Sequence, residues 1–110
     1  MKTLKFASKL VPLVLSGEKT VTWRLFDDKD LKVDDDLIFV DKGTGEEFAG
    51  ARITSIMEKA LGDITSEDEV GHESFRDAEE RFITYCKYYG DRVTQDTIVK
   101  MLEFELTDKR

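Results

Sequence analysis

Gly17-Glu18-Lys19-Thr20-Val21-Thr22-Trp23-Arg24 combines, within one short stretch, a turn glycine, an amine, two hydroxyls, an indole and a guanidinium. Its polar and apolar side chains alternate, which predicts a β-strand after a glycine turn. The polar face of that strand holds Thr20, Thr22 and Arg24, and the apolar face holds Val21, Trp23 and Leu25. We expect the apolar face to pack in the core, and the polar face either to line a site or simply to be exposed to water.

The position of Lys19 depends on a turn. Strict alternation along the strand would place Lys19 on the face opposite Thr22. The two side chains therefore meet only if the backbone from Gly17 to Lys19 turns outside the regular strand. A lysine held in a pocket by such a turn would lose water contact, so its pKa would fall and it could act as a base.

The remaining sequence predicts an α+β fold with a curled or barrel-like sheet. Hydrophobic patterns predict strands at residues 3–6, 20–25, 37–40, 48–57 and 98–107, and helices at 11–16 and 74–89. Residues 37–57 are expected to form a hairpin, residues 26–36 an acidic loop, and residues 58–72 an irregular segment with a helical turn after Thr65.

Local signals mark the ends of both predicted helices. Pro12 suits the first turn of the first helix, and Gly17 suits the left-handed position that ends it. Ser74 followed by Asp77 resembles a capping box at the start of the second helix, and Gly90 supplies its end. The apolar stripe of that helix consists of Phe75, Ala78, Phe82, Tyr85 and Tyr89.

Length and charge limit the possible functions. The 110 residues predict a single domain spanning residues 1–110, and the net charge of −7 disfavours tight binding to long nucleic acid. A local basic pocket or a nucleoside-sized ligand remains compatible with that charge. Cys86, the single cysteine, is expected to be a buried structural thiol and indicates a reducing compartment. With no predicted signal peptide or membrane span, we expect a cytoplasmic protein, and we expect a monomer.

Several candidate site residues have ordinary alternatives. Arg24 can hold a carbonyl, carboxylate or phosphate, but on a strand it is more often paired with a nearby acid. Trp23 is expected in the core, although an indole beside a pocket can stack on a base. His72 is the single histidine and is expected to be exposed, with general acid as its less favoured role. One histidine does not support a His-based metal site.

The octapeptide Gly17–Arg24 resembles the Gly-x-Lys-x-x-x-x-Arg signature of the ASCH domain family. The preceding Val14–Gly17, the segment Leu61–Thr65 and the helix entry Glu73–Phe75 resemble other parts of the family pattern. The similarity extends over nearly the whole chain. It implies a PUA-like fold, which is a small curled β-barrel with two to three helices and a cleft beside the first helix.

The resemblance also implies a catalytic set. Small bacterial members of the family are amidohydrolases that remove the acetyl group from N4-acetylcytidine. Their motif lysine, the threonine three residues later and a glutamate opening the later helix correspond here to Lys19, Thr22 and Glu73. Glu69 and Glu67 are the alternatives for the glutamate. By this resemblance Thr22 would attack the amide carbonyl, Lys19 would accept its proton, and Glu73 would assist the leaving amine, without a metal or organic cofactor.

The expected substrate-binding residues are Arg24, Trp23 and Thr20. At two positions this chain departs from those hydrolases. Trp23 replaces their aliphatic residue and Leu25 replaces their acid, so the substrate can differ from theirs although the pocket is shared. The favoured function is hydrolysis of an acylated cytidine or a related nucleoside. The alternative is a non-catalytic RNA-binding module that uses the same cleft, and a ribonuclease is less favoured.

Overall fold

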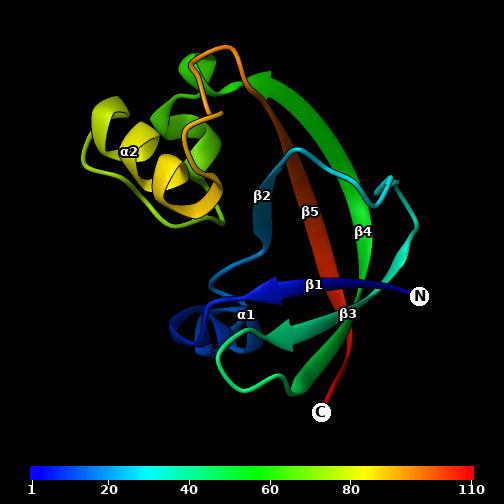
Figure 1. Ribbon diagram of the computed structural model, residues 1–110. Helices are drawn as coiled ribbons and strands as arrows, with labels where there is room; N and C mark the ends of the chain where they lie inside the picture. Colours follow the sequence, from blue (N-terminus) through cyan, green and yellow to red (C-terminus); the bar gives the residue numbers. More distant parts are fainter.

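Seven helices and strands make up the fold. The computed structural model describes residues 1–110 (Figure 1). Its strands are β1 (Lys2–Phe6), β2 (Val21–Leu25), β3 (Asp36–Asp41), β4 (Glu47–Ala60) and β5 (Ile98–Lys109). Its helices are α1 (Val11–Ser16) and α2 (Ala78–Tyr89), with short 3-10 turns at Ser8–Leu10, Leu61–Asp63 and Ser66–Glu69.

The five strands form one curled sheet in the order β1-β3-β4-β5-β2. Only β1 and β3 pair in parallel, and the other three neighbouring pairs are antiparallel. Irregularities in the β4–β5 register at Gly50/Ala51 and Ile53/Ser55 bend these two long strands. The sheet therefore curls into a half-barrel whose open side lies between the edge strands β1 and β2 (Figure 1). The predicted α+β fold with a curled barrel is confirmed.

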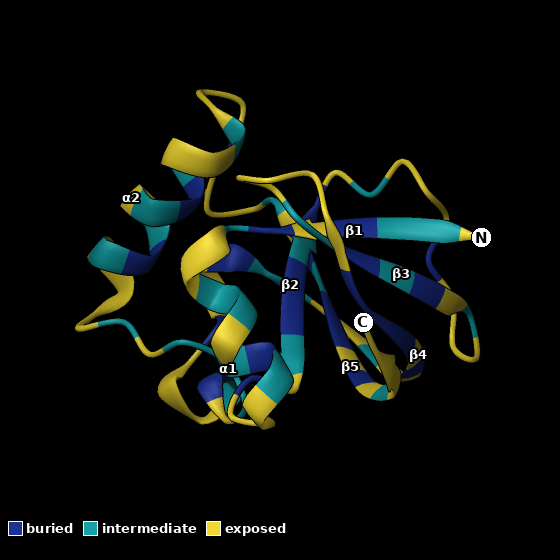
Figure 2. Ribbon diagram, turned by 90° about the horizontal axis from the view of Figure 1, so that it is seen from below, coloured by how far each residue is buried: buried dark blue, intermediate teal, exposed yellow.

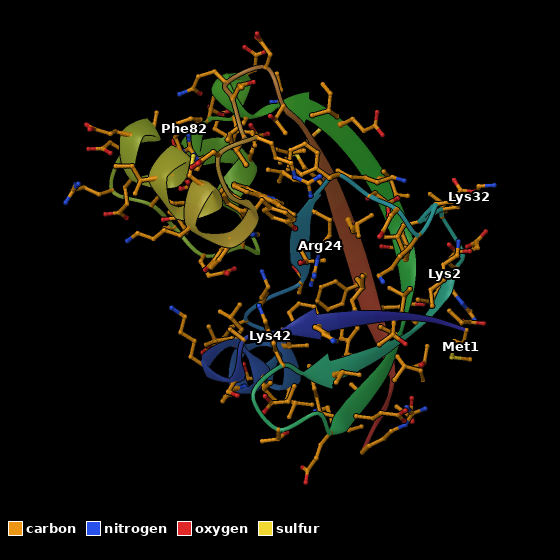
Figure 3. The ribbon with its side chains drawn as sticks, viewed as in Figure 1. Met1, Lys2, Arg24, Lys32, Lys42 and Phe82 are labelled. Carbon is orange, nitrogen blue, oxygen red and sulfur yellow. The ribbon has the colours of Figure 1, made fainter.

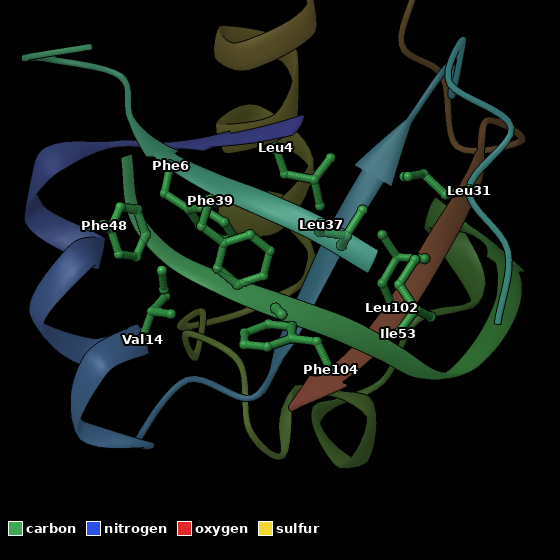
Figure 4. Close-up of a cluster of buried hydrophobic side chains, with 12 residues drawn as sticks. Leu4, Phe6, Val14, Leu31, Leu37, Phe39, Phe48, Ile53, Leu102 and Phe104 are labelled. Atoms are coloured by element: carbon green, nitrogen blue, oxygen red, sulfur yellow. The ribbon is translucent and has the colours of Figure 1, made fainter. Parts of the chain in front are cut away.

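Two hydrophobic clusters fill the two ends of this sheet. The first lies inside the curl and packs against α1; among its members are Phe6, Phe39 and Phe104 (Figure 4). The second lies between β2, β5 and α2 and includes Trp23, Tyr85 and Met101. Figure 2 shows both helices turning their buried sides toward the sheet. The two helices thus pack against different clusters, α1 against the first and α2 against the second.

The predicted ends of α1 are confirmed. Pro12 occupies the first turn, and Gly17 has a φ of 86° and donates its N–H to the carbonyl of Val14. A left-handed glycine at this place reverses the chain so that Lys19 leaves the helix toward β2. The turn that the sequence required between Gly17 and Lys19 is therefore present. None of the helices is long and apolar enough to cross a membrane.

The predicted start of α2 is wrong. The helix begins at Ala78 rather than Ser74, because the Asp77 carboxylate accepts the N–H of Glu80 at 2.8 Å and caps the first turn. Phe75 therefore lies outside the helix, although it still packs against the second cluster. Glu73, which was expected immediately before the helix, lies in the loop several residues ahead of it. The end at Gly90, with a φ of 89°, agrees with the prediction.

Gly71 joins this loop to β2. Its carbonyl accepts the N–H groups of both Thr20, at 2.9 Å, and Val21, at 3.0 Å. Gly71 has a φ of 77°, and a Cβ on it would lie 2.3 Å from the Thr20 hydroxyl oxygen. The loop can approach the strand this closely only because residue 71 has no side chain.

Substitution of Gly71 should destabilise the protein more than substitution of a comparable glycine. Gly45 has a similar φ of 78° but open space where a Cβ would lie. We expect Gly45→Ala to cost about 1 kcal/mol from backbone strain, and Gly71→Ala about 2–3 kcal/mol, because the clash with Thr20 is added. Urea unfolding of both variants measures the difference, and equal losses would contradict the close packing.

Candidate active site

A cavity of about 250 Å³ opens between the edge strands β1 and β2. Five of the six predicted site residues line it: Lys19, Thr22, Trp23, Arg24 and Glu73. His72, which was predicted to be exposed, lines it as well. The unpaired edges of a half-barrel leave room for a ligand that a closed barrel would fill with side chains.

Lys19 is buried within the cavity, at 4% exposure. Its Nζ donates to the Val21 carbonyl at 2.8 Å and to Oε2 of Glu73 at 2.5 Å. Burial lowers the pKa of the Lys19 amine, and this effect outweighs the attraction of the Glu73 carboxylate, which raises it. Lys19 therefore gives up its proton more readily than a surface lysine.

Glu73 reaches the cavity from the loop between the last 3-10 turn and α2. Burial acts to raise the pKa of its carboxyl, but the charges of Lys19 and His72 and the hydrogen bond from Lys19 together hold it below the usual value. Glu73 is thus an ionised carboxylate at neutral pH. Its side chain is still 30% exposed, so it can also meet a ligand.

Thr22 and Arg24 point into the cavity from the same face of β2, as predicted. Arg24 Nε donates to the Thr22 hydroxyl oxygen at 3.2 Å, and its terminal nitrogen donates to the Lys5 carbonyl at 3.0 Å. The guanidinium carbon lies 4.9 Å from the centre of the Phe6 ring. Arg24 therefore bridges the two edge strands (Figure 3). It forms no ion pair, so the expected alternative of pairing with a nearby acid does not apply.

The His72 side chain is only 2% exposed, which corrects the prediction of an exposed histidine. Its ring stacks on Trp23 with centroids 3.9 Å apart. Nδ1 lies 3.0 Å from the Glu73 carbonyl, and Nε2 lies 3.4 Å from the Tyr85 hydroxyl. Since Nδ1 faces an acceptor, we assign its proton there, with Tyr85 donating to Nε2. His72 is buried because its ring stacks on Trp23. This contact is tertiary, and the polar neighbours of His72 in the sequence do not predict it.

Trp23 serves both the core and the cavity. It belongs to the second hydrophobic cluster, as expected, and it also forms part of the cavity wall. Its indole Nε1 is buried without a hydrogen-bond partner. The stacked Trp23 and His72 rings make one side of the cavity flat and aromatic, which suits a planar base.

Three other predicted residues lie outside the cavity. Thr20 is exposed and packs against Gly71. Glu69 is buried and binds Arg81 at 2.8 Å, so this carboxylate is neutralised beneath the loop. Glu67 is exposed to solvent. Of the three candidate glutamates, only Glu73 binds Lys19 and lines the cavity that also contains Thr22.

Two lysines and two tyrosines that line the cavity were not among the predicted site residues. Lys5 and Lys42 line the cavity from the β1 and β3 side, and no motif marked them. Tyr85 and Tyr89 were predicted as the apolar stripe of α2 and also line the cavity. No group of three or more His, Cys, Asp or Glu side chains is placed to hold a metal ion.

The pKa of His72 offers a direct test of this geometry. Burial, together with the positive charge of Lys19, lowers the pKa of His72 from about 6.5 to about 4, although the Glu73 carboxylate acts against this. Because the chain has a single histidine, one imidazole NMR signal reports its titration without assignment. We expect a midpoint near 4, and a midpoint above 6 would contradict the buried stack.

The lowered pKa of His72 also makes the free energy of unfolding depend on pH. Between about pH 4 and pH 6.5 the unfolded chain binds a proton at His72 that the folded protein does not. The free energy of unfolding should therefore fall by about 3 kcal/mol as the pH is lowered through this range. Urea unfolding at pH 7 and pH 4 measures the loss, and His72→Phe, which retains an aromatic ring, should lose that much less than the wild type.

Comparisons with known proteins support the fold. Neither a protein-family model nor a curated protein matches the sequence. Among solved structures, protein EF3133 from Enterococcus faecalis, labelled with the family DUF984, is 21% identical, with a TM-score of 0.78 over 99% of this chain and 81% of its own.

Two further solved structures are ASCH domains. The ASCH domain from Lactobacillus crispatus is 14% identical, with a TM-score of 0.67 over 96% of this chain and 79% of its own. The ASCH protein from Zymomonas mobilis is 13% identical, with the same TM-score over 98% of this chain and 67% of its own. The chain therefore has the fold of the ASCH domain structures.

Proposed function

We propose that this chain is a member of the ASCH family that hydrolyses an amide, removing an acyl group from N4-acylated cytidine or a related nucleoside. The observation that carries the proposal is the convergence of Lys19, Thr22 and Glu73 on one cavity. Lys19 and Glu73 are 54 positions apart in the sequence, yet their side chains form a 2.5 Å hydrogen bond. A buried amine, a hydroxyl and a carboxylate side by side are the groups that acyl transfer requires.

In the first step, the Thr22 oxygen attacks the carbonyl carbon of the N4-acyl group. The hydroxyl oxygen already accepts a hydrogen bond from Arg24, and its own proton has no protein acceptor. Arg24 would stabilise the negative charge that develops on this oxygen as its proton leaves. Thr22 is therefore held as a nucleophile by its neighbour on the strand.

Lys19 is the proposed proton acceptor. A neutral amine has two N–H donors and one lone pair. The Val21 carbonyl and Glu73 accept the two donors, which leaves the lone pair for the Thr22 proton. Lys19 and Thr22 are not hydrogen-bonded to each other, and catalytic contacts of this kind commonly tighten when substrate binds.

Collapse of the tetrahedral intermediate breaks the bond between the acyl carbon and N4. The proton taken up by Lys19 passes to the leaving nitrogen, directly or through Glu73, and cytidine departs. Water then attacks the acyl-threonine ester, Glu73 accepts a water proton, and the Thr22 oxygen regains a proton. The products are cytidine and the free carboxylic acid, and no cofactor enters the balance.

Removal of the Thr22 hydroxyl should abolish turnover. We expect Thr22→Ala to hydrolyse N4-acetylcytidine at least about a hundredfold more slowly than the wild type, and Thr22→Ser to retain measurable activity. Liquid chromatography of the released cytidine measures both rates. Thr54→Ala is the matched control, because Thr54 is exposed on β4 outside the cavity and its loss should leave the rate unchanged. Equal rates for Thr22→Ala and the wild type would overturn the proposal.

The rate should also depend on the protonation of Lys19. Because only the neutral amine can accept the Thr22 proton, kcat/KM should rise with pH and level off below the ordinary lysine pKa of about 10.4. Lys19→Arg should be inactive over the whole range, since a guanidinium remains protonated. Activity of Lys19→Arg comparable to that of the wild type would exclude Lys19 as the base.

A second candidate function is binding of RNA without catalysis. It is favoured by the cations Lys5, Lys19, Arg24 and Lys42 around the same cavity. Affinity for short single-stranded RNA that falls steeply with salt, without turnover of acylated cytidine, would support it. A ribonuclease is less favoured, because the single histidine is neutral and no second histidine is present for acid-base work.

A further inference from the structure

The cavity is positively charged although the chain as a whole is acidic. Four cationic side chains line it, Lys5, Lys19, Arg24 and Lys42, against the single carboxylate of Glu73. The net charge of the chain is −7. Glu73 pairs with Lys19, and the other three cations form no ion pair. Unneutralised cations gathered at one opening of an acidic protein indicate an anionic ligand.

Arg24 is the fixed part of this positive region. Its hydrogen bonds to Thr22 and to the Lys5 carbonyl use two of its five N–H donors, and it rests over the Phe6 ring. The remaining donors have no protein acceptor. Burial lowers the pKa of this guanidinium, and an anion beside it would offset the loss of water contact.

Lys5 and Lys42 line the cavity together with Arg24. Lys5 belongs to β1, and its own carbonyl is the one that Arg24 binds. Lys42 follows β3, and its N–H donates to the Phe6 carbonyl at 2.8 Å, so its backbone is tied to the end of β1. Both side chains are exposed. Figure 3 shows Arg24 between β2 and β1, and Lys42 beyond the end of β1 near α1.

The opposite side of Arg24 carries the reverse charge. A second, more open groove of about 490 Å³ shares Arg24 with the cavity and is lined by Asp27, Asp28, Asp30 and Glu58. Lys100 in this groove is neutralised by Asp27 at 2.8 Å. A nucleic-acid strand passing through the cavity would bring its next phosphate against these carboxylates, which disfavours a long polyanion.

We infer that the ligand of the cavity is a nucleoside monophosphate, whose base enters between β1 and β2 and whose phosphate binds Arg24, Lys5 and Lys42. The identity of the nucleoside, an N4-acylated cytidine, rests on the proposed function. A volume of about 250 Å³ is small for a ligand pocket, so the phosphate lies at the mouth, where both lysines stand. A strand that extended from the cavity past Arg24 would meet the acidic groove, so a single nucleotide is the favoured ligand.

Binding of reaction products tests this inference without turnover. Isothermal titration calorimetry at low salt compares cytidine, cytidine 5′-monophosphate, cytidine 3′-monophosphate and a five-residue oligocytidylate. We expect one of the two monophosphates to bind about tenfold more tightly than cytidine, with an advantage that shrinks as salt is added. The Lys5→Gln/Lys42→Gln double variant should lose most of that advantage, measured as the ratio of the two affinities.

The matched control is Lys87→Gln/Lys109→Gln, which removes the same charge from two exposed lysines that do not line the cavity. It should retain the advantage of the monophosphate. Equal binding of cytidine and both monophosphates by the wild type would overturn the inference, as would an equal effect of the two double variants. Tighter binding of the oligocytidylate than of either monophosphate would replace it with recognition of a strand.

Failure of the inference can be told apart from failure of the proposed function. If neither N4-acetylcytidine nor its monophosphates are hydrolysed, but cytidine monophosphate binds through Lys5 and Lys42, the proposed hydrolase activity is excluded and the phosphate site stands. If N4-acetylcytidine is hydrolysed as efficiently as its monophosphates, with equal kcat/KM, the hydrolase stands and the phosphate site is excluded.

Discussion

The contact between the Gly71 carbonyl and the start of β2 is the constraint on which the site depends. Two strand N–H groups, from Thr20 and Val21, bind this one carbonyl, and the loop thereby becomes fixed against the edge of the sheet. His72 and Glu73 follow immediately, so the same contact brings them over Trp23 and Lys19. The cavity exists because a half-barrel leaves its edge open and this loop covers part of the opening.

Burial and charge oppose each other within the cavity, and their balance defines its chemistry. Burial lowers the pKa of Lys19, while Glu73 partly compensates. The same burial keeps His72 neutral, so the positive charge of the cavity comes from lysine and arginine alone. Arg24 adds a cation without a carboxylate partner and also closes the gap between β2 and β1. The side chain that bridges the two strands is thus also the one that we propose to bind an anion.

Much of the fold could be predicted from local patterns. Alternation along residues 98–107 identified β5 and its inward Leu102 and Phe104, and the glycine after α1 identified the turn that directs Lys19. The start of α2 was misplaced because Ser74 and Asp77 are both good capping residues, and the sequence does not say which of them accepts the first backbone N–H. The exposure of His72 was misjudged because a polar sequence context does not reveal an aromatic stack across a loop.

The sequence by itself determined the α+β class, the two helices, the alternating strand from Val21 to Leu25 and the residue types available for a site. These depend on hydrophobic period and on glycine at positive φ, which are local properties of the chain. Only the tertiary structure decided that Glu73, and neither Glu69 nor Glu67, meets Lys19, and that Lys5 and Lys42 line the same cavity as Arg24. These residues are far apart in the sequence. They come together because of the curl of the sheet, the order of its strands and the contact of the Gly71 carbonyl with the start of β2.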